Sequence, residues 1–392
     1  MGLGDCRCHF TPPTTTATTD DPRITSYVHL LLREISATPP ASDPPLQTVF
    51  FGGGTPSLVP PRLVSSILDA LRVKFGLSAL PEVSIEMDPG TFGAEKLREL
   101  IGVGVNRVSL GVQAFQEDLL RSCGRAHGIR EVEEAIEIVR SSGLENWSMD
   151  LISSLPHQTL GMWEESLRRA VDARPTHLSV YDLQVHSWGV PLPSETESAC
   201  FYRTASEALS SAGYDHYEIS SYCRDGFMCK HNLAYWQNRS FYAFGLGSAS
   251  YVNGIRFSRP RSMREYTRYV EKLEGGALDR LENRAGDVRD RAMDVVMLSL
   301  RTAGGLDVRR LGREFGEGIA LGVCEAFRPY VDSGHVVVMD DERRPLLPSG
   351  DDWRLSGEGE NRREVAFIRL SDPDGFLLSN ELISIAFGVI SP

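Results

Sequence analysis

The stretch Thr48–Ser57, TVFFGGGTPS, determines how the rest of the chain is interpreted. Its apolar run Val49–Phe51, rich in β-branched and aromatic side chains, is typical of a buried strand. The three glycines that follow permit a sharp turn and a close approach of the backbone to a ligand. Pro60 and Pro61 then open a predicted helix over 61–75, which carries one apolar stripe. A glycine loop between a strand and a helix is where parallel α/β folds bind ligands, although an isolated triple glycine can also be a simple tight turn.

Strands and helices alternate around this loop. The predicted strands cover 83–87, 107–113, 148–152 and 177–183, and the predicted helices cover 23–36, 94–102, 116–122, 129–142 and 162–172. Such alternation indicates βα units, a parallel sheet and right-handed crossovers. A repeat of about 30 residues predicts a full or partial barrel whose functional residues lie on the loops after the strands.

Polar residues occur where these strands end. They are Glu86 and Asp88, Gln113, Asp150, Tyr181, Asp182 and Gln184, with Arg125 and His127 shortly after the third strand. A single such residue is most often a satisfied polar group of the core. Several together favour a lined pocket. Acidic and amide groups in it could hold hydroxyls and an ammonium, and Arg125 could hold a carboxylate.

The pattern changes after about residue 190. Tyr217–Tyr222 is a predicted strand, CKHNLAYW follows over Cys229–Trp236, and Phe244–Ser248 is a second glycine-rich turn. His231 is either a hydrogen-bonded structural histidine or a ligand. From about 286 a separate module begins. It has predicted helices at 292–300, 308–315 and 320–331 and short strands at 335–339 and 353–355. Helices followed by a small ribbon predict a winged-helix-like module, and its many acids favour a packing or interaction role over DNA binding.

Composition narrows the functional classes. The 392-residue chain has a formal net charge of -12, which argues against a nucleic-acid or acidic-membrane partner. It contains no apolar stretch of the roughly 20 residues that a transmembrane helix needs. Its seven irregularly spaced cysteines are not typical of a disulfide framework and favour a reducing compartment. The N-terminus lacks the features of a secretory signal, and we expect a soluble protein that is not secreted.

The first 22 residues form a Thr/Pro-rich segment that we expect to be flexible. Cys6, Cys8 and His9 lie close together there. They are either a chance group or part of a metal site.

Several ordered motifs resemble one protein family. FGGGTPS, EMDPG, RVSLGVQAF, GRAH, MDLISSLPHQT, HLSVYDLQV and HNLAYW, with the closing helical module, cover roughly residues 45 to 390. Together they resemble the oxygen-independent coproporphyrinogen III oxidase-like group of radical S-adenosylmethionine proteins, and HNxxYW resembles its HemW type. The resemblance implies a partial (β/α)6 TIM-like barrel followed by the winged-helix-like module. It also implies three segments: a flexible 1–22, a barrel with its HNxxYW extension over 23–285, and a C-terminal module over 286–392.

The resemblance also assigns site residues. It implies that Gly53, Gly54 and Thr55 meet the methionine end of S-adenosylmethionine, and that the remaining contacts come from the polar residues at strand ends: Glu86, Gln113, Arg125, Asp150 and Gln184. His231 and Cys229 are the candidate haem-side residues. The HemW type is regarded as a haem-binding chaperone, so the resemblance implies haem trafficking to an acceptor protein that the sequence does not identify.

One motif of the family is incomplete. The family binds a [4Fe–4S] cluster through CxxxCxxC, leaving one iron open for S-adenosylmethionine, and soft thiolates suit such a cluster. Only Cys6 and Cys8, spaced CxC, stand where that loop should end. A truncated or mis-spliced gene model is the preferred explanation, and a variant that lost its cluster is the alternative.

Three functional hypotheses follow. The first is a haem chaperone of the HemW type, the second is a coproporphyrinogen III oxidase acting by radical hydrogen abstraction, and the third is a cluster-less scaffold without catalysis. Whether the protein is an enzyme stays open among them. The closing residues resemble those of plant members, so the expected compartment is a chloroplast, a mitochondrion or the cytoplasm.

Overall fold

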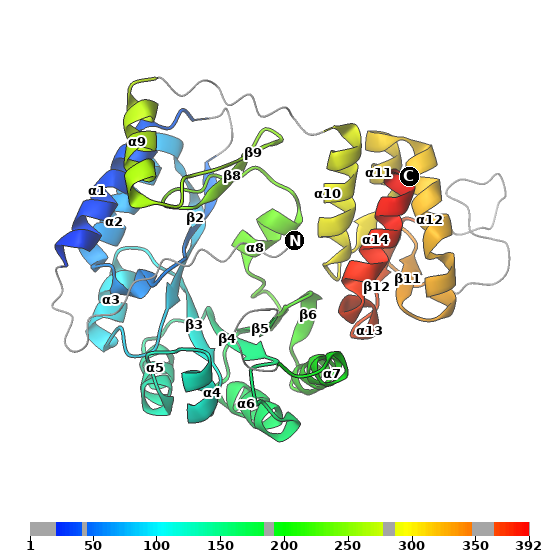
Figure 1. Cartoon of the computed structure of the whole chain (residues 1–392), viewed down its shortest axis with the longest axis horizontal. Coiled ribbons are helices and arrows are strands. Elements are labelled where there is room, and N and C mark those ends of the chain that lie inside the picture. Colours follow the sequence, from blue (N-terminus) through cyan, green and yellow to red (C-terminus); the bar gives the residue numbers. More distant parts are fainter. Residues whose placement is uncertain (1–20, 41–44, 184–191, 277–286, 347–363, 392) are drawn as a thin grey trace. The chain divides into compact units, whose positions relative to one another are not determined.

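The structure is a computed structural model that describes residues 21–40, 45–183, 192–276, 287–346 and 364–391 (Figure 1). The described residues form two compact units. Unit 1 comprises those within 1–151, 173–176 and 240–285, and unit 2 those within 152–172, 177–239 and 286–392. The predicted strand at 353–355 lies outside the described residues, as do Cys6, Cys8 and Gln184.

A mainly parallel sheet forms the centre of the fold. Its strand order is β1-β2-β3-β4-β5-β7-β6. Strands β1 to β4 run parallel to one another, whereas β7 is antiparallel to both β5 and β6. The bounds are β1 Leu46–Phe51, β2 Leu77–Met87, β3 Arg107–Gln113, β4 Trp147–Ser153, β5 His177–Asp182, β6 Asp215–Glu218 and β7 Ser221–Cys223. This is the α/β alternation that the sequence predicts, with an antiparallel hairpin at the end of the sheet.

The prediction of a single strand over Tyr217–Tyr222 is wrong. The chain turns between β6 and β7, and the backbone amide of Ile219 leaves the sheet ladder to bond the carbonyl oxygen of Arg301 at 2.9 Å. Glu218 is buried at this turn, and its carboxylate accepts a hydrogen bond from the Ser220 amide at 3.2 Å. These contacts favour a tight hairpin over one continuous strand.

Helices follow the strands as expected. They are α1 Pro22–Ala37, η1 Pro56–Leu58, α2 Pro61–Phe75, α3 Ala94–Gly102, α4 Glu117–Ser122, α5 Ile129–Ser141, α6 Leu160–Ala173, α7 Glu195–Ser211 and α8 Lys230–Trp236. In unit 1, α2 contacts α3 and α3 contacts α5, and Figure 1 shows these helices as a layer on one side of the strands. Helix α2 buries its predicted apolar stripe, which contains Leu63, Val64, Ile67, Leu68 and Leu71.

Polar and apolar side chains alternate along β2, β3 and β4, so this part of the sheet has one apolar and one polar face. Odd-numbered residues of β2 are apolar and buried, as Val83, Ile85 and Met87 show. Because neighbouring side chains in a strand point to opposite faces, the even-numbered residues of β2 lie on the other face. The register places Glu86 beside Ser109 and Ser109 beside Ser148. We call this polar side of β2, β3 and β4 the inner face.

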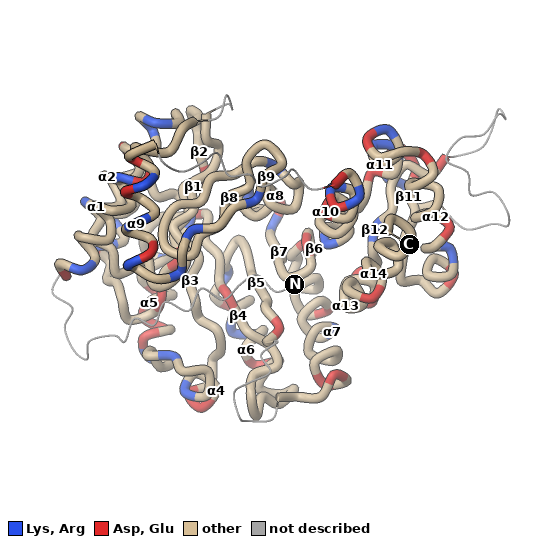
Figure 2. The backbone as a smooth tube through the Cα atoms, turned by 45° about the horizontal axis from the view of Figure 1, so that its top comes forward, with Lys and Arg blue, Asp and Glu red and all other residues tan. Residues whose placement is uncertain are grey.

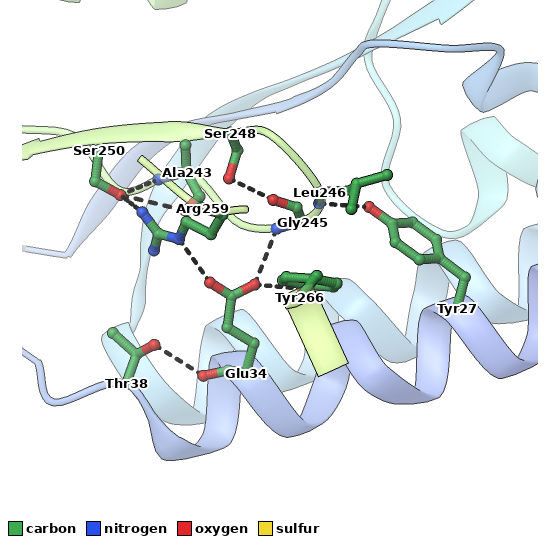
Figure 3. Close-up of polar contacts among 10 residues, drawn as sticks. All are labelled: Tyr27, Glu34, Thr38, Ala243, Gly245, Leu246, Ser248, Ser250, Arg259 and Tyr266. Atoms are coloured by element: carbon green, nitrogen blue, oxygen red, sulfur yellow. Dashed lines mark hydrogen bonds and ion pairs between the residues drawn. The ribbon is translucent and has the colours of Figure 1, made fainter. Parts of the chain in front are cut away.

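A segment distant in sequence completes unit 1. It contains the hairpin of β8 Ala249–Val252 and β9 Ile255–Ser258, followed by α9 Met263–Glu274. Glu34 of α1 fixes it (Figure 3): its carboxylate pairs with Arg259 at 2.7 Å and accepts hydrogen bonds from Tyr266 at 2.5 Å and from the Gly245 amide at 2.9 Å. The side chains of Glu34 and Arg259 are 0% and 1% exposed, so the pair is fully desolvated. The second glycine-rich turn is therefore anchored to α1 by a buried ion pair.

The C-terminal module belongs to unit 2. It consists of α10 Val288–Leu300, β10 Leu306–Asp307, α11 Val308–Phe315, α12 Glu317–Asp332, β11 Val336–Met339, β12 Phe367–Leu370, α13 Asp374–Leu377 and α14 Ser379–Ile390. The five helices and an antiparallel sheet of order β10-β12-β11 enclose one apolar core, in agreement with the predicted module of helices and a small ribbon. β12 and α14 were not predicted. The ribbon partner of β11 is β12, and 27 residues, 340 to 366, separate the two strands along the chain.

Charges of both signs are mixed on this module. Figure 2 shows acidic and basic positions interspersed along α10 and α11. Arg309 of α11 pairs with Asp341 at 2.8 Å and with Glu364 at 3.0 Å, and Arg310 pairs with Glu314 at 2.7 Å. These pairs neutralise much of the basic charge of α11, which agrees with an interaction or packing role. Among the described helices, none combines the length and apolarity that a bilayer span requires.

Candidate functional site

The glycine loop after β1 has a backbone that only glycine adopts readily. Gly53 and Gly54 have φ values of 76° and 67°, in the left-handed region. A Cβ atom on either would meet no atom within 4 Å, so the loop borders open space. At Gly52 the opposite holds, because a Cβ there would lie 2.8 Å from Phe50 Cε1 and 3.0 Å from Glu86 Oε1. The loop is therefore pressed against the end of β2 on one side and free on the other.

Glu86 at the end of β2 is the titratable group beside this loop. Its Oε2 accepts a hydrogen bond from the Gly53 amide at 3.0 Å. Burial raises the pKa of Glu86 to about 7, and the nearby Asp150 and Asp88 carboxylates contribute in the same direction, while the Gly53 amide and Arg125 oppose the shift. A buried carboxylate that gains stability when a cation arrives is typical of a binding site.

Asp88, two residues further along, connects three loops. Its Oδ2 accepts a hydrogen bond from the Thr55 hydroxyl at 3.4 Å, and its Oδ1 lies 3.4 Å from Arg125 Nη1. A Cβ at Gly111 would lie 2.9 Å from Asp88 Oδ1, so β3 approaches the carboxylate closely. Asp88 thus joins the glycine loop, the end of β3 and the segment that carries Arg125.

A second layer of hydrogen bonds holds Asp88 and the glycine loop in place. The Ser57 hydroxyl accepts a hydrogen bond from the Asp88 amide at 3.2 Å and lies 2.6 Å from the Thr91 hydroxyl. The Lys96 ammonium donates a hydrogen bond to the Ser57 carbonyl oxygen. Burial lowers the pKa of Lys96. The Lys96 ammonium on α3 therefore holds the backbone at Ser57, just after the glycine loop.

Gln113 and Asp150 complete the set. Gln113 is buried at the end of β3 with a φ of 71°, a left-handed conformation that is uncommon for residues other than glycine. The Ser109 hydroxyl lies 2.9 and 3.1 Å from the two carboxylate oxygens of Asp150. Gln113 comes from β3, which lies next to β2, and Asp150 comes from β4, which lies next to β3. The Asp150 carboxylate helps to raise the pKa of Glu86.

The structure thus brings together, at one edge of unit 1, most of the site residues expected from sequence: Gly53, Gly54, Thr55, Glu86, Gln113, Arg125 and Asp150. Gln184, Cys6 and Cys8 lie outside the described residues. Ser57 and Ser109 were not singled out from the sequence, and Asp88 was named only among the polar residues at strand ends, without a role from the resemblance. Asp88 follows Glu86 by two residues, and this spacing places both side chains on one face of an extended chain, a signal that the sequence did contain.

The haem candidates belong to unit 2. His231 Nε2 lies 2.7 Å from the Tyr235 hydroxyl on α8, one helical turn away. Cys229 is buried, and its backbone amide donates a hydrogen bond to the Tyr217 hydroxyl at 3.3 Å. Across the described residues, no group of three or more His, Cys, Asp or Glu side chains has an arrangement that could hold a metal ion.

These groups are of the kinds that could hold a zwitterionic amino-acid group. Glu86 and Asp88 offer carboxylates to an ammonium or sulfonium, Arg125 offers a guanidinium to a carboxylate, and the open side of Gly53 and Gly54 lets a ligand approach the backbone. Opposite charges next to each other are what a zwitterionic amino-acid group requires.

Comparison with known proteins agrees with this fold. The Radical SAM superfamily family model matches residues 8–170. The solved structure of coproporphyrinogen III oxidase from Escherichia coli, described as a radical SAM enzyme, covers 95% of this chain with a TM-score of 0.71; 84% of that chain is covered, at 19% identity. The fold is therefore the partial barrel of the radical SAM class with a small C-terminal module. That class uses S-adenosylmethionine with a [4Fe–4S] cluster.

Curated relatives narrow the class further. The heme chaperone HemW of Synechocystis is 36% identical over 384 residues, which cover 93% of this chain and 88% of the relative. The heme chaperone HemW of Lactococcus lactis is 30% identical, with 74% of this chain and 78% of the relative covered. The chain belongs to the HemW family of radical SAM proteins.

Proposed function

We propose that this protein binds S-adenosylmethionine at the edge of unit 1 and binds haem for delivery to an acceptor protein. The observation that carries the first part is the joined pair of Gly53 and Glu86, a free glycine backbone beside a buried carboxylate. Gly53, Gly54 and Thr55 would line the methionyl group, Glu86 would face its cationic end, and Arg125 would face its carboxylate. Gln113 and Asp150 supply further polar contacts, and Gln184 is proposed from the motif alone.

Support for haem comes from the family. The relatives that match 93% and 74% of this chain are named heme chaperones, and this chain carries HNLAYW at His231–Trp236. The imidazole of His231, oriented by the Tyr235 hydroxyl, is a haem ligand of the ordinary kind. Cys229 is the alternative, but it is buried and would need to be uncovered before it could reach iron.

A titration of the purified protein with haem tests this function. We expect a shift of the Soret band that saturates at one haem per chain. His231→Ala should weaken binding and change the ligand signature, whereas His29→Ala on α1 is a matched control that should change neither. No spectral change in a folded sample would contradict the proposal.

The cluster is a separate question. Cys6 and Cys8 are the proposed thiolate ligands of an incomplete motif, so no step of the function is assigned to the cluster. Anaerobic iron–sulfur reconstitution tests these cysteines. About four irons per chain, with absorbance near 400 nm, would indicate that they take part in a site, and Cys6→Ser with Cys8→Ser should then abolish it. A protein without iron would favour the cluster-less scaffold.

Coproporphyrinogen III oxidation is the second candidate. It is supported by the same pocket, while the match to the oxidase structure concerns the fold. Formation of decarboxylated product by the reconstituted protein would favour it. The division into a segment 1–22, a barrel over 23–285 and a module over 286–392 is likewise proposed, and limited proteolysis near 277–286 would test the second boundary.

A further inference from the structure

Three neighbouring polar residues lie on the inner face toward the amino-terminal ends of the strands. In β2 and β3 they precede Glu86 and Ser109 by two residues. Ser84 of β2 is in register with Arg107 of β3. Val108 pairs with Trp147, and its amide bonds the Asn146 carbonyl oxygen at 3.4 Å, so Asn146 lies beside Arg107 at the start of β4. Alternation along each strand places these three on the inner face. We call Ser84, Arg107 and Asn146 the lower row.

Ser84 and Arg107 are buried, Asn146 is half-buried, and one side-chain atom of each is shielded without a hydrogen-bond partner. Ser84 is 0% exposed and Arg107 is 1% exposed. Among the described residues, Ser84 Oγ, Arg107 Nε and Asn146 Oδ1 have no hydrogen-bond partner, although each is shielded from solvent. The row above differs, because the Asp150 carboxylate is paired with Ser109 and the Glu86 carboxylate with Gly53. In the described chain five buried side-chain atoms have no hydrogen-bond partner; three belong to the lower row, and the other two are His127 Nε2 and the Tyr222 hydroxyl.

The cost of this arrangement is large. Most buried polar atoms in proteins are hydrogen-bonded, and a buried charge without a counter-ion is among the most destabilising features a fold can carry. The other deeply buried guanidinium of unit 1, that of Arg259, follows the rule by pairing with Glu34 at 2.7 Å. Arg107 has no such carboxylate within the described chain. A fold keeps unpaired groups of this kind chiefly where a ligand completes them.

We propose that the lower row is a binding site for a carboxylate. A carboxylate would accept a hydrogen bond from Arg107 Nε and another from the Ser84 hydroxyl, and its negative charge would compensate the guanidinium. The Asn146 amide would bond the same group or an adjoining water. Phosphate is disfavoured because Glu86 and Asp150 lie one step above the row and would repel a doubly charged group.

This assignment rests on the proposed function, which supplies two carboxylate sources. One is a haem propionate and the other is the carboxylate of S-adenosylmethionine. The proposed function assigns the second group to Arg125 at the edge of the site, so the propionate is the source we expect. The two sources are separated by ligands that differ only in the carboxylate: haem is compared with its dimethyl ester, and S-adenosylmethionine with its decarboxylated form.

The test uses Arg107→Met in the full chain, with Arg98→Met on the exposed face of α3 as control. We expect Arg107→Met to melt at the same or a higher temperature without ligand, because it removes a buried unpaired charge. We expect it to weaken haem binding by about tenfold or more, because a charge-assisted hydrogen bond is lost, and to bind the dimethyl ester as the wild type does. The control should change neither quantity.

Ser84→Ala is a second test variant, which keeps the proposal testable if Arg107→Met fails to fold. It removes only the unsatisfied hydroxyl, so it should leave the melting temperature unchanged and weaken haem binding severalfold. Selective weakening of S-adenosylmethionine in both variants would identify the other carboxylate. A lower melting temperature with unchanged affinity for both ligands would overturn the proposal, since Arg107 would then be a structural residue. Absence of haem and S-adenosylmethionine binding in the wild type would instead contradict the proposed function.

Discussion

The Gly53 amide donates a hydrogen bond of 3.0 Å to Oε2 of Glu86, and this contact joins the glycine loop to the end of the neighbouring strand. The loop has its backbone in the left-handed region, and the carboxylate is buried with its pKa raised to about 7. The two features depend on each other, because the amide that stabilises the charged carboxylate is available only in this loop conformation. The conformation of the glycine loop and the protonation of Glu86 are therefore coupled through this hydrogen bond.

Glu86 should make stability depend on pH. Its folded pKa lies above the unfolded value of 4.5, so between about pH 4.5 and 7 the native state holds the proton more tightly, and stability falls as the pH rises through this range. The ionised carboxylate would then cost up to about 3 kcal/mol above pH 7. We expect the melting temperature of Glu86→Gln, relative to that of the wild type, to increase as the pH rises from 5 to 8. A constant difference across this range would contradict the prediction.

The same carboxylate should make ligand affinity depend on pH. A sulfonium or ammonium next to Glu86 favours its ionised form, so binding of S-adenosylmethionine at pH 6 must first remove a proton. We expect affinity to rise from pH 6 to 8 and to level off above the pKa. Calorimetry in buffers of different ionisation enthalpy should detect proton release near pH 6.5. In Glu86→Gln this release should disappear.

Asp88→Asn tests the residue that joins three loops. The substitution keeps the shape but removes the charge facing Arg125 and weakens the acceptor for Thr55. We expect S-adenosylmethionine affinity to fall severalfold, since both contacts are long and partly exposed. Asp118→Asn, on exposed α4, is the matched control and should have no effect in the same calorimetric titration. Equal affinities of the two variants would show that Asp88 does not position the site.

Gly52→Ala tests how closely the loop packs on β2. The added methyl would lie 2.8 Å from Phe50 Cε1 and 3.0 Å from Glu86 Oε1, so one of these side chains must move. We expect a loss of about 1–3 kcal/mol in the free energy of unfolding, together with weaker ligand binding. Gly93→Ala is the control, because a Cβ there meets nothing within 4 Å. Chemical denaturation measures both variants, and a neutral Gly52→Ala would contradict the close packing.

Glu34→Gln tests the buried pair that anchors the second glycine-rich turn. It leaves the guanidinium of Arg259 buried without a counter-charge, and breaking a buried pair in this way costs about 3–5 kcal/mol. Glu274→Gln removes the exposed partner of Arg33 and should cost less than about 1 kcal/mol. Urea denaturation of the two variants should differ accordingly. Similar midpoints would indicate that water reaches the Glu34 pair.

The sequence alone determined the parts that depend on local pattern. Alternating strands and helices, the glycine loop and its helix follow from residue periodicity and from the backbone freedom of glycine, and the structure contains them with shifts at their ends. The same holds for Glu86, Gln113 and Asp150, because a polar residue at the end of a predicted parallel strand is placed at a known edge of the sheet.

Only the tertiary structure decided which of these residues act on one another. The link between Asp88 and Arg125 spans 37 residues, and the anchoring of Gly245 by Glu34 spans 211, distances along the chain at which no local pattern carries information. The turn between β6 and β7 was missed for the same reason, since Ile219 is drawn from the ladder by Arg301. The unsatisfied lower row follows from strand register, which places Ser84, Arg107 and Asn146 together and leaves their polar atoms without partners in the described chain. Local sequence specifies the helices and strands, whereas burial and strand register specify which charged side chains contact one another. The reason is that desolvation and charge pairing act between segments that only folding brings together.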